Sequence, residues 1–150
     1  MGISTALHAL AAVIWVGGMF FAYMAMRPAV IKVIEPSRRP ELWCHTLSLF
    51  FRYVWACIGV LLVTGYGLIH ALGGMGSVNW HIHVMHGLGL LMMLIFLHLV
   101  FAPYKRLKQA VHSGDMDEGT RRVGQIRQFV GINLVIGLVV VLIAAGGRYW

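Results

Sequence analysis

The chain has 150 residues, of which 59% are hydrophobic and 11% are charged, and its formal net charge at pH 7 is +7. This hydrophobic fraction excludes a soluble nucleic-acid-binding domain, although such a domain would share the positive charge. The length leaves no room for a separate soluble catalytic domain beside the apolar segments. Any chemistry therefore has to take place among those segments or at their ends.

Four apolar segments are long enough to cross a bilayer, because a helix needs about 20 apolar residues to span the hydrocarbon. In chain order we place them at about residues 3–26, 49–72, 81–102 and 126–146. A glycine-rich run, 73–79, separates the second segment from the third. The prediction is an all-α integral membrane protein, a single domain folded as an antiparallel bundle of four transmembrane helices.

The basic residues predict the orientation of this bundle. Eleven of the twelve Lys and Arg residues fall in two stretches, 27–52 and 105–127, which include the connections after the first and third spans. The glycine-rich connection contains no charged residue. Because Lys and Arg are retained on the cytoplasmic side, we expect the basic connections in the cytoplasm and both termini outside it. The expected location is a bacterial inner membrane, whose anionic lipid attracts the basic residues.

Histidine is the most informative residue type in the spans, because an ionisable side chain is costly in the bilayer and marks a functional site. Five histidines lie near the predicted extracytoplasmic ends of the first three spans: His8, His70, His81, His83 and His86. A rise of about 1.5 Å per residue puts His8 and His86 at a similar depth, on spans that run in the same direction. Trp15 follows His8 by seven residues and lies on the same helical face.

Two imidazoles at one depth on facing helices suit the axial ligation of b-type haem. We expect His8 and His86 to be those ligands, with Trp15 and His70 beside the cofactor. His98, nearer the other end of the third span, can ligate a second haem or contact a neighbouring helix. The haem propionates would turn to the nearer water, where Arg148 offers a guanidinium group for pairing.

A haem with two axial protein ligands has no open coordination position, which favours electron transfer over oxygen binding. The main functional hypothesis is therefore a redox protein with a membrane quinone or a small reductant as its partner. Oxidation of a porphyrinogen is left open as an enzymatic activity, and so is assembly into a homo-oligomer.

Copper is the competing use of the same histidines. His83 and His86 are spaced i, i+3 on one helical face, and His70 and Met85 lie near them. Imidazole together with thioether suits copper. The alternative is thus a copper-binding or copper-permeation protein that uses His83, His86, His70 and a methionine such as Met85. A third hypothesis is a structural subunit of a larger complex, without haem.

The first span also carries a motif. Leu7-His8 is followed by Trp15-x-Gly17-Gly18-Met19-Phe20 and then by Arg27-Pro28. This motif resembles the opening of the CopD-type copper-resistance membrane proteins, which implies a small multi-span protein that handles copper. The layout of the spans is similar to that of HemJ-type protoporphyrinogen oxidases. That similarity implies a haem-associated role for His8, although His86 stands in the region where those enzymes carry a Lys.

Overall fold

The computed structural model describes residues 1–147, which form helices joined by short connections and contain no β-strand. The α-helices are α1 (Gly2–Phe21), α2 (Arg27–Val33), α3 (Arg39–Ala71), α4 (Trp80–Leu99), α5 (Lys105–Ser113) and α6 (Met116–Gly146). Two π-helical segments join α1 to α2 and α4 to α5, and two short 3-10 helices precede α3 and α4: η1 (Ala22–Met26), η4 (Val100–Tyr104), η2 (Pro36–Arg38) and η3 (Met75–Ser77).

These elements combine into four continuous helical rods that are long and apolar enough to cross a membrane: Gly2–Val33, Pro36–Ala71, Trp80–Ser113 and Met116–Gly146. The predicted four-helix membrane bundle is confirmed. Rods of 31 to 36 residues are about 46 to 54 Å long, which exceeds the roughly 30 Å of hydrocarbon. The helices therefore continue beyond the predicted spans, and most basic residues that we expected in irregular connections are helical.

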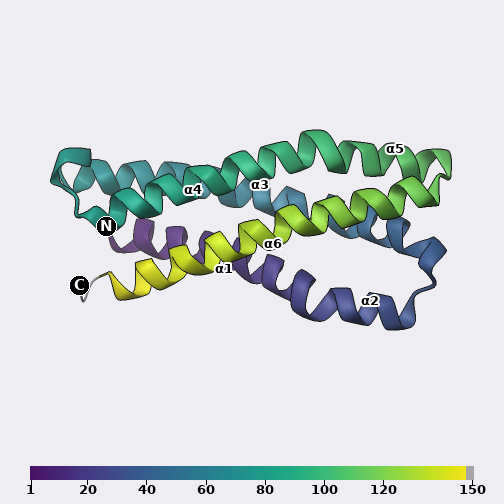
Figure 1. Cartoon of the computed structure of the whole chain (residues 1–150). Helices are drawn as coiled ribbons and strands as arrows, with labels where there is room; N and C mark the ends of the chain where they lie inside the picture. Colours follow the sequence, from purple (N-terminus) through teal and green to yellow (C-terminus); the bar gives the residue numbers. More distant parts are fainter. Residues whose placement is uncertain (148–150) are drawn as a thin grey trace.

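The bundle is elongated and its two ends differ (Figure 1). One end, which we call the histidine end, holds the N-terminus, the connection 72–79 and the last residues of α6. The other, which we call the basic end, holds the connections 34–35 and 114–115. The N-terminus and the end of α6 thus lie together, as expected. Which side of the membrane they face stays a prediction.

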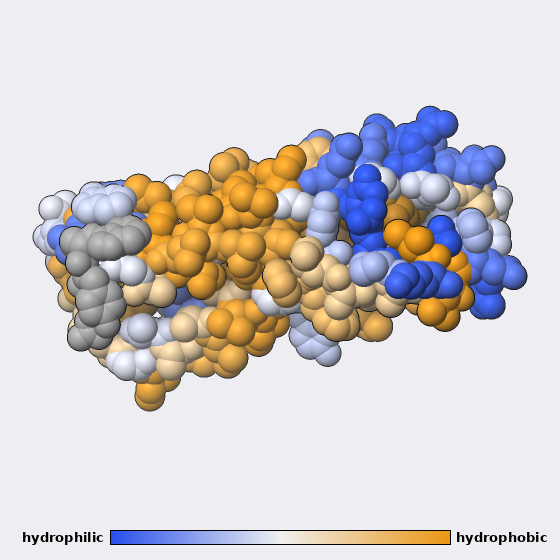
Figure 2. Space-filling model, turned by 60° about the horizontal axis from the view of Figure 1, so that its bottom comes forward, coloured by the Kyte–Doolittle hydropathy of each residue, from blue (hydrophilic) through white to orange (hydrophobic). Residues whose placement is uncertain are grey.

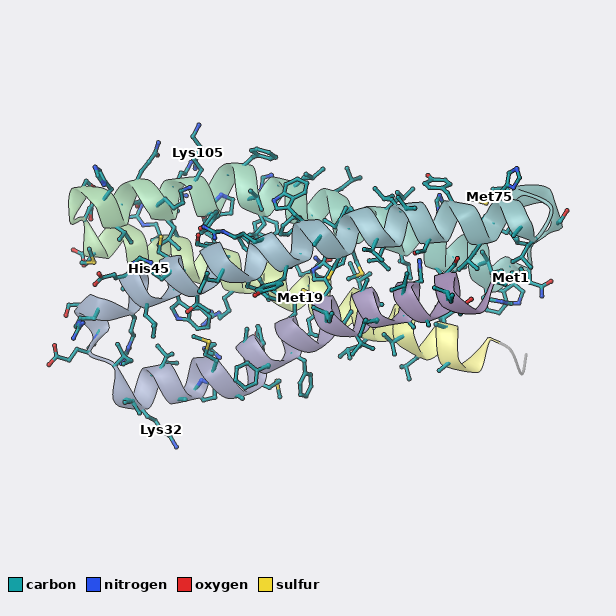
Figure 3. All side chains as sticks on the ribbon, turned by 180° about the vertical axis from the view of Figure 1, so that it is seen from behind. Met1, Met19, Lys32, His45, Met75 and Lys105 are labelled. Atoms are coloured by element: carbon teal, nitrogen blue, oxygen red, sulfur yellow. The ribbon has the colours of Figure 1, made fainter. Side chains whose placement is uncertain are left out.

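The surface has the polarity of a membrane protein. Large apolar side chains point outward from the rods, and Ile3, Val63 and Leu142 are 80%, 76% and 68% exposed. Figure 2 shows apolar surface over much of the bundle and hydrophilic surface gathered toward the basic end. Met1 and Met75 lie at the histidine end, whereas Lys32, His45 and Lys105 lie toward the opposite end (Figure 3). The exposed apolar side chains are explained if lipid surrounds them.

Prolines shape the two rods that contain π-helical segments. Pro103 lies inside η4, and Pro28 is the second residue of α2, directly after η1. Proline lacks an N–H group and its ring clashes with the preceding turn, so a helix that continues past it must deviate from α geometry. Beyond η1, α2 diverges from the other helices in both views of the bundle (Figures 1 and 3).

The centre of the bundle is closed by buried aromatic side chains, which we call the aromatic layer: Trp15, Phe51 and Phe96. The rings meet edge to face, with centroid distances of 6.1 Å between Trp15 and Phe96 and 5.3 Å between Phe51 and Phe96. α1 packs mainly along α3, and α4 packs mainly along α6. The parallel helices α1 and α4 consequently lie diagonally across the bundle, as a four-helix arrangement requires.

Candidate functional site

A cavity of about 600 Å³ lies at the histidine end between α1, α3, α4 and α6, and we call it the histidine cavity. His8 from α1 and His86 from α4 both line it. Its lining contains no Asp, Glu, Lys or Arg and is mainly apolar. The aromatic and sulfur-containing side chains of the lining are Trp15, Tyr66, Met1, Met85, Met92 and Met93. The two histidines that share a depth on parallel helices thus line one cavity, and their role as ligands stays a prediction.

The His8 ring is oriented by a hydrogen bond from α3. Thr64 Oγ1 donates to the carbonyl oxygen of Val60 at 2.6 Å. The Thr64 hydroxyl proton is therefore engaged, and His8 Nδ1–H donates to Thr64 Oγ1 at 2.8 Å. This places the proton of the neutral imidazole on Nδ1 and leaves the Nε2 lone pair for another partner. Metal-binding histidines commonly have their second ring nitrogen hydrogen-bonded in this way.

Gly65 makes room for the same ring. A Cβ atom at this position would lie 3.2 Å from His8 Cε1, closer than ordinary van der Waals contact. Thr64 and Gly65 together position the His8 ring, and the sequence analysis did not identify them as residues of the site. A signal was present, because Thr64 lies seven residues before the end of α3, about as deep as His8 in its own helix.

His86 is held differently. Its ring is half-buried and packs edge-on against Tyr66 from α3, with a centroid distance of 5.3 Å. Trp15, which we predicted beside the site, is 3% exposed and forms part of the floor of the cavity. The cavity therefore presents two imidazoles that are positioned by side chains of the same neighbouring helix.

The other predicted ligands are only partly brought together. Met85 lines the cavity, whereas His70 and His83 are exposed and are not among its lining residues. At 100° per residue, the His83 side chain lies about 60° from His86 on the side away from Met85, which turns it away from the part of α4 that lines the cavity.

Two further predicted residues lie elsewhere. His98 is exposed, and its ring contacts Phe129 of α6 at a centroid distance of 5.0 Å, which fits a contact with a neighbouring helix. Arg148, the predicted partner of haem propionates, lies outside the described residues.

The side chains available as metal ligands limit how the cavity can bind a metal ion. Within residues 1–147, no three His, Cys, Asp or Glu side chains come close enough to hold a metal ion. An ion bound by both His8 and His86 would therefore take further protein ligands from methionine thioethers. Met85 is the neighbour of His86 in sequence and also lines the cavity.

Four long apolar rods, with a cavity of imidazole and thioether groups and no charged side chain at one end, define a multi-pass membrane protein with a candidate site for a soft metal ion or a flat cofactor. Residues 44–146 match the family described as copper resistance protein D, and the chain belongs to this family. No curated protein and no solved structure matches the chain.

The family match confirms the CopD-type resemblance, yet it covers a different part of the chain from the motif that suggested it. It begins within α3 and includes Thr64, Met85 and His86, whereas His8 and Trp15 precede it. The match relates the protein to copper and favours the copper alternative over the haem hypothesis. The similarity to HemJ-type enzymes stays a prediction.

Proposed function

We propose that the protein binds copper(I) in the histidine cavity, with His8 Nε2 and His86 as nitrogen ligands and Met85 as a thioether ligand. One observation carries the proposal: imidazoles from two diagonally placed helices line one cavity together with methionines. Soft thioether ligands select copper(I), and imidazole is compatible with it. Membership of the copper resistance protein D family supports the same metal.

The absence of carboxylates and thiolates from the lining favours a monovalent ion. An ion that leaves water for apolar surroundings loses solvation, and the loss rises steeply with its charge. Carboxylates or thiolates would lower this cost for divalent zinc or copper, and the lining of the histidine cavity contains neither. Copper(I), with a single charge and a preference for soft ligands, carries the smallest penalty among these ions.

Thr64 and the aromatic layer have separate roles in this proposal. Thr64 orients His8 so that Nε2 is available, and Gly65 leaves space for the ring. Trp15 and Phe96 close the floor of the cavity toward the basic end, since both are buried and in contact. Copper would therefore enter and leave from the histidine end, and permeation across the bilayer would require the aromatic layer to open.

The proposal is tested with purified protein in detergent that is loaded with copper under ascorbate. Competition with the copper(I) chelator bicinchoninate measures affinity. His8→Ala, His86→Ala and Met85→Leu should each weaken binding, the histidine variants by about tenfold or more. His45→Ala and His112→Ala serve as controls, because both residues are exposed and lie toward the basic end. Unchanged affinity in both His8→Ala and His86→Ala would refute the site.

A second candidate function is the binding of haem b by the same two histidines. The observation in its favour is the size of the cavity, about 600 Å³, because sites for cofactor-sized ligands span roughly 300–1,000 Å³. The visible spectrum of the same preparation separates the two candidates. A Soret band that is lost in His86→Ala would support haem, whereas a colourless protein that retains copper(I) would exclude it.

A further inference from the structure

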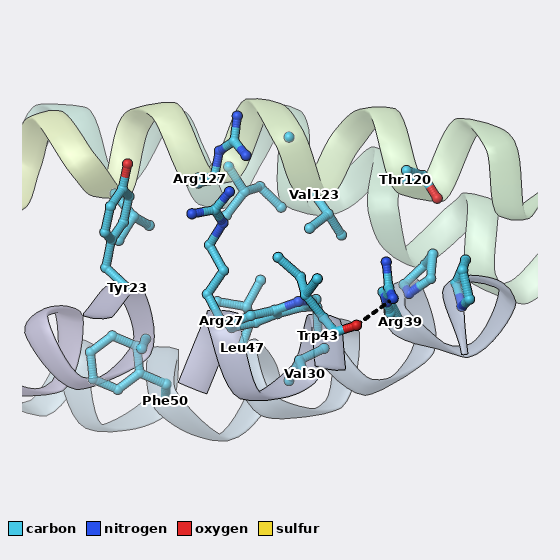
Figure 4. A pocket seen from close by; sticks show the side chains of 17 residues that line it. Tyr23, Arg27, Val30, Arg39, Trp43, Leu47, Phe50, Thr120, Val123 and Arg127 are labelled. Carbon is cyan, nitrogen blue, oxygen red and sulfur yellow. Dashed lines mark hydrogen bonds between the residues drawn. The ribbon is translucent and has the colours of Figure 1, made fainter. Parts of the chain in front are cut away.

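A second cavity, of about 370 Å³, lies toward the basic end between α2, α3 and α6 (Figure 4). Three arginines line it, Arg27, Arg39 and Arg127, and no Asp or Glu does. We call it the arginine cavity. It occupies the region where α2 diverges from the other helices after Pro28. Its charge and position set it apart from the histidine cavity.

The three arginines differ in what they contact. Arg39 caps the C-terminal end of α2, because its guanidinium group donates to the carbonyl oxygens of Ile31 at 2.7 Å and Ile34 at 2.9 Å. Arg27 lies over the Tyr23 ring, 5.9 Å from its centroid. Neither Arg27 nor Arg127 pairs with a carboxylate, since the two ion pairs among the described residues join Arg121 and Arg122 to Glu118.

Arg27 and Arg127 therefore bring two positive charges to one cavity without a compensating negative charge. In Figure 4 the Arg27 side chain extends from α2 toward α6, which carries Arg127. Like charges at short range repel, and the repulsion is stronger near apolar walls than in water. An anion between the two groups would remove this cost. Guanidinium groups match the geometry of phosphate in particular.

The lining changes in polarity along the bundle. Toward the basic end it includes Thr120, which lies seven residues from Arg127 on α6, about 10 Å away along the helix axis. Toward the centre it includes the apolar residues Ala22, Phe50 and Val130. Arg27 and Arg127, followed by apolar residues toward the centre, match the phosphate and the acyl chain of a phospholipid, and the basic end of the lining contains Thr120 beside the apolar Pro36 and Pro40. A small soluble anion would leave the apolar part of the cavity unfilled.

We propose that the arginine cavity binds an anionic phospholipid, with its phosphate between Arg27 and Arg127 and the start of an acyl chain beside Phe50 and Val130. Basic pockets between transmembrane helices recognise anionic headgroups by this chemistry. The site is independent of the proposed copper site. It gives the protein a binding function for a lipid in addition to a metal.

The test is native mass spectrometry of delipidated protein that is mixed with phosphatidylglycerol or with phosphatidylcholine of identical acyl chains. The wild-type protein should retain phosphatidylglycerol about tenfold or more in preference to phosphatidylcholine. The double variant Arg27→Gln/Arg127→Gln should lose this preference. The matched control is Arg52→Gln/Arg106→Gln, which removes the same charge from two exposed residues that lie outside the cavity and take no part in the two ion pairs. It should keep the preference.

Three results would overturn the proposal. The first is equal loss in both double variants, which would assign the preference to total charge. The second is equal retention of the two lipids by the wild-type protein. The third is displacement of phosphatidylglycerol by an equimolar amount of inorganic phosphate, which would indicate a site for a soluble anion. Arg27→Lys/Arg127→Lys guards against misfolding, because it keeps the charge and should retain part of the preference.

Discussion

The two cavities lie toward opposite ends of one bundle and have opposite chemistry. The histidine cavity contains imidazoles and thioethers and no charged side chain, whereas the arginine cavity contains three guanidinium groups. The difference follows from depth. Neutral ligand groups can be placed inside the apolar part of a bundle, whereas arginines are tolerated where their charge can approach the interface. One fold can thus offer sites for a soft cation and for an anion.

The cavities also arise in different ways. The histidine cavity is closely packed where α1 meets α6, since a Cβ atom on Gly137, which lines it, would lie 2.8 Å from Val16 Cγ2. The arginine cavity lies where α2 diverges after Pro28, and a Cβ atom on Gly124, which lines it, would meet nothing within 4 Å. We therefore expect an added methyl group to be tolerated less well at Gly137 than at Gly124.

The largest expected effect concerns which side of the membrane each cavity faces. Reporter fusions after Gly74 should be extracytoplasmic and fusions after Gly114 cytoplasmic, because the basic residues gather toward the end that contains Gly114. Paired fusions to alkaline phosphatase and to green fluorescent protein make this an all-or-none measurement. If both positions report the same side, the four rods do not all cross the membrane.

The next prediction tests whether the copper(I) site and the phospholipid site are independent. His8→Ala combined with His86→Ala should weaken copper(I) binding by about 100-fold or more, since it removes both nitrogen ligands. The same variant should retain phosphatidylglycerol as the wild-type protein does. Arg27→Gln/Arg127→Gln should show the reverse pattern. Chelator competition and native mass spectrometry measure the two properties, and a loss of both in either variant would contradict independent sites.

A smaller effect is expected from the hydrogen bond between His8 and Thr64. Thr64→Val removes the acceptor for His8 Nδ1–H while it preserves the shape of the side chain, and it should weaken copper(I) binding by about tenfold. Thr64→Ser keeps the hydroxyl group and should bind as the wild-type protein does. Equal affinity of the valine and serine variants would show that the hydrogen bond does not position the ligand.

The effect of an added methyl group on stability should differ between one glycine of the histidine cavity and one glycine of the arginine cavity. Gly137→Ala should lower the free energy of unfolding by about 1–3 kcal/mol, because the added methyl group meets Val16 and Met92. Gly124→Ala should leave stability unchanged or raise it by up to about 1 kcal/mol, since alanine favours the helix and the space is open. Unfolding in mixed micelles measures both. The reverse order of stability would contradict the comparison of the cavities.

The smallest effect is expected in the region between the cavities. Asn133 is 3% exposed, its Nδ2 donates to the carbonyl oxygen of Met92 at 3.3 Å, and its Oδ1 has no partner among the described residues. Hydrogen bonds between transmembrane helices contribute only about 0.6 kcal/mol on average. Asn133→Leu should therefore change the free energy of unfolding by less than about 1 kcal/mol. A loss of several kcal/mol in the same assay would reveal a polar role for this residue.

Particular residues show where sequence reasoning succeeded and where it stopped. The depth match of His8 and His86 was predictable, because the helical rise is constant. The helix ends were less so, since π-helical segments carry the helices past Pro28 and Pro103 instead of ending them. The depth of Thr64 in its helix was equally readable, but depth alone does not decide which side chains at one level turn toward each other, so neither the hydrogen bond between His8 and Thr64 nor the shared cavity of Arg27 and Arg127 followed from the sequence.

The sequence by itself determined the four membrane rods, the difference between the two ends and the depth of each ionisable group. These properties depend on local hydropathy, on charge and on a fixed rise per residue. Only the tertiary structure decided which side chains face a common cavity and where α2 diverges to form the second one. The physical reason is that the rotation and tilt of a helix are set by packing against helices that are distant in sequence.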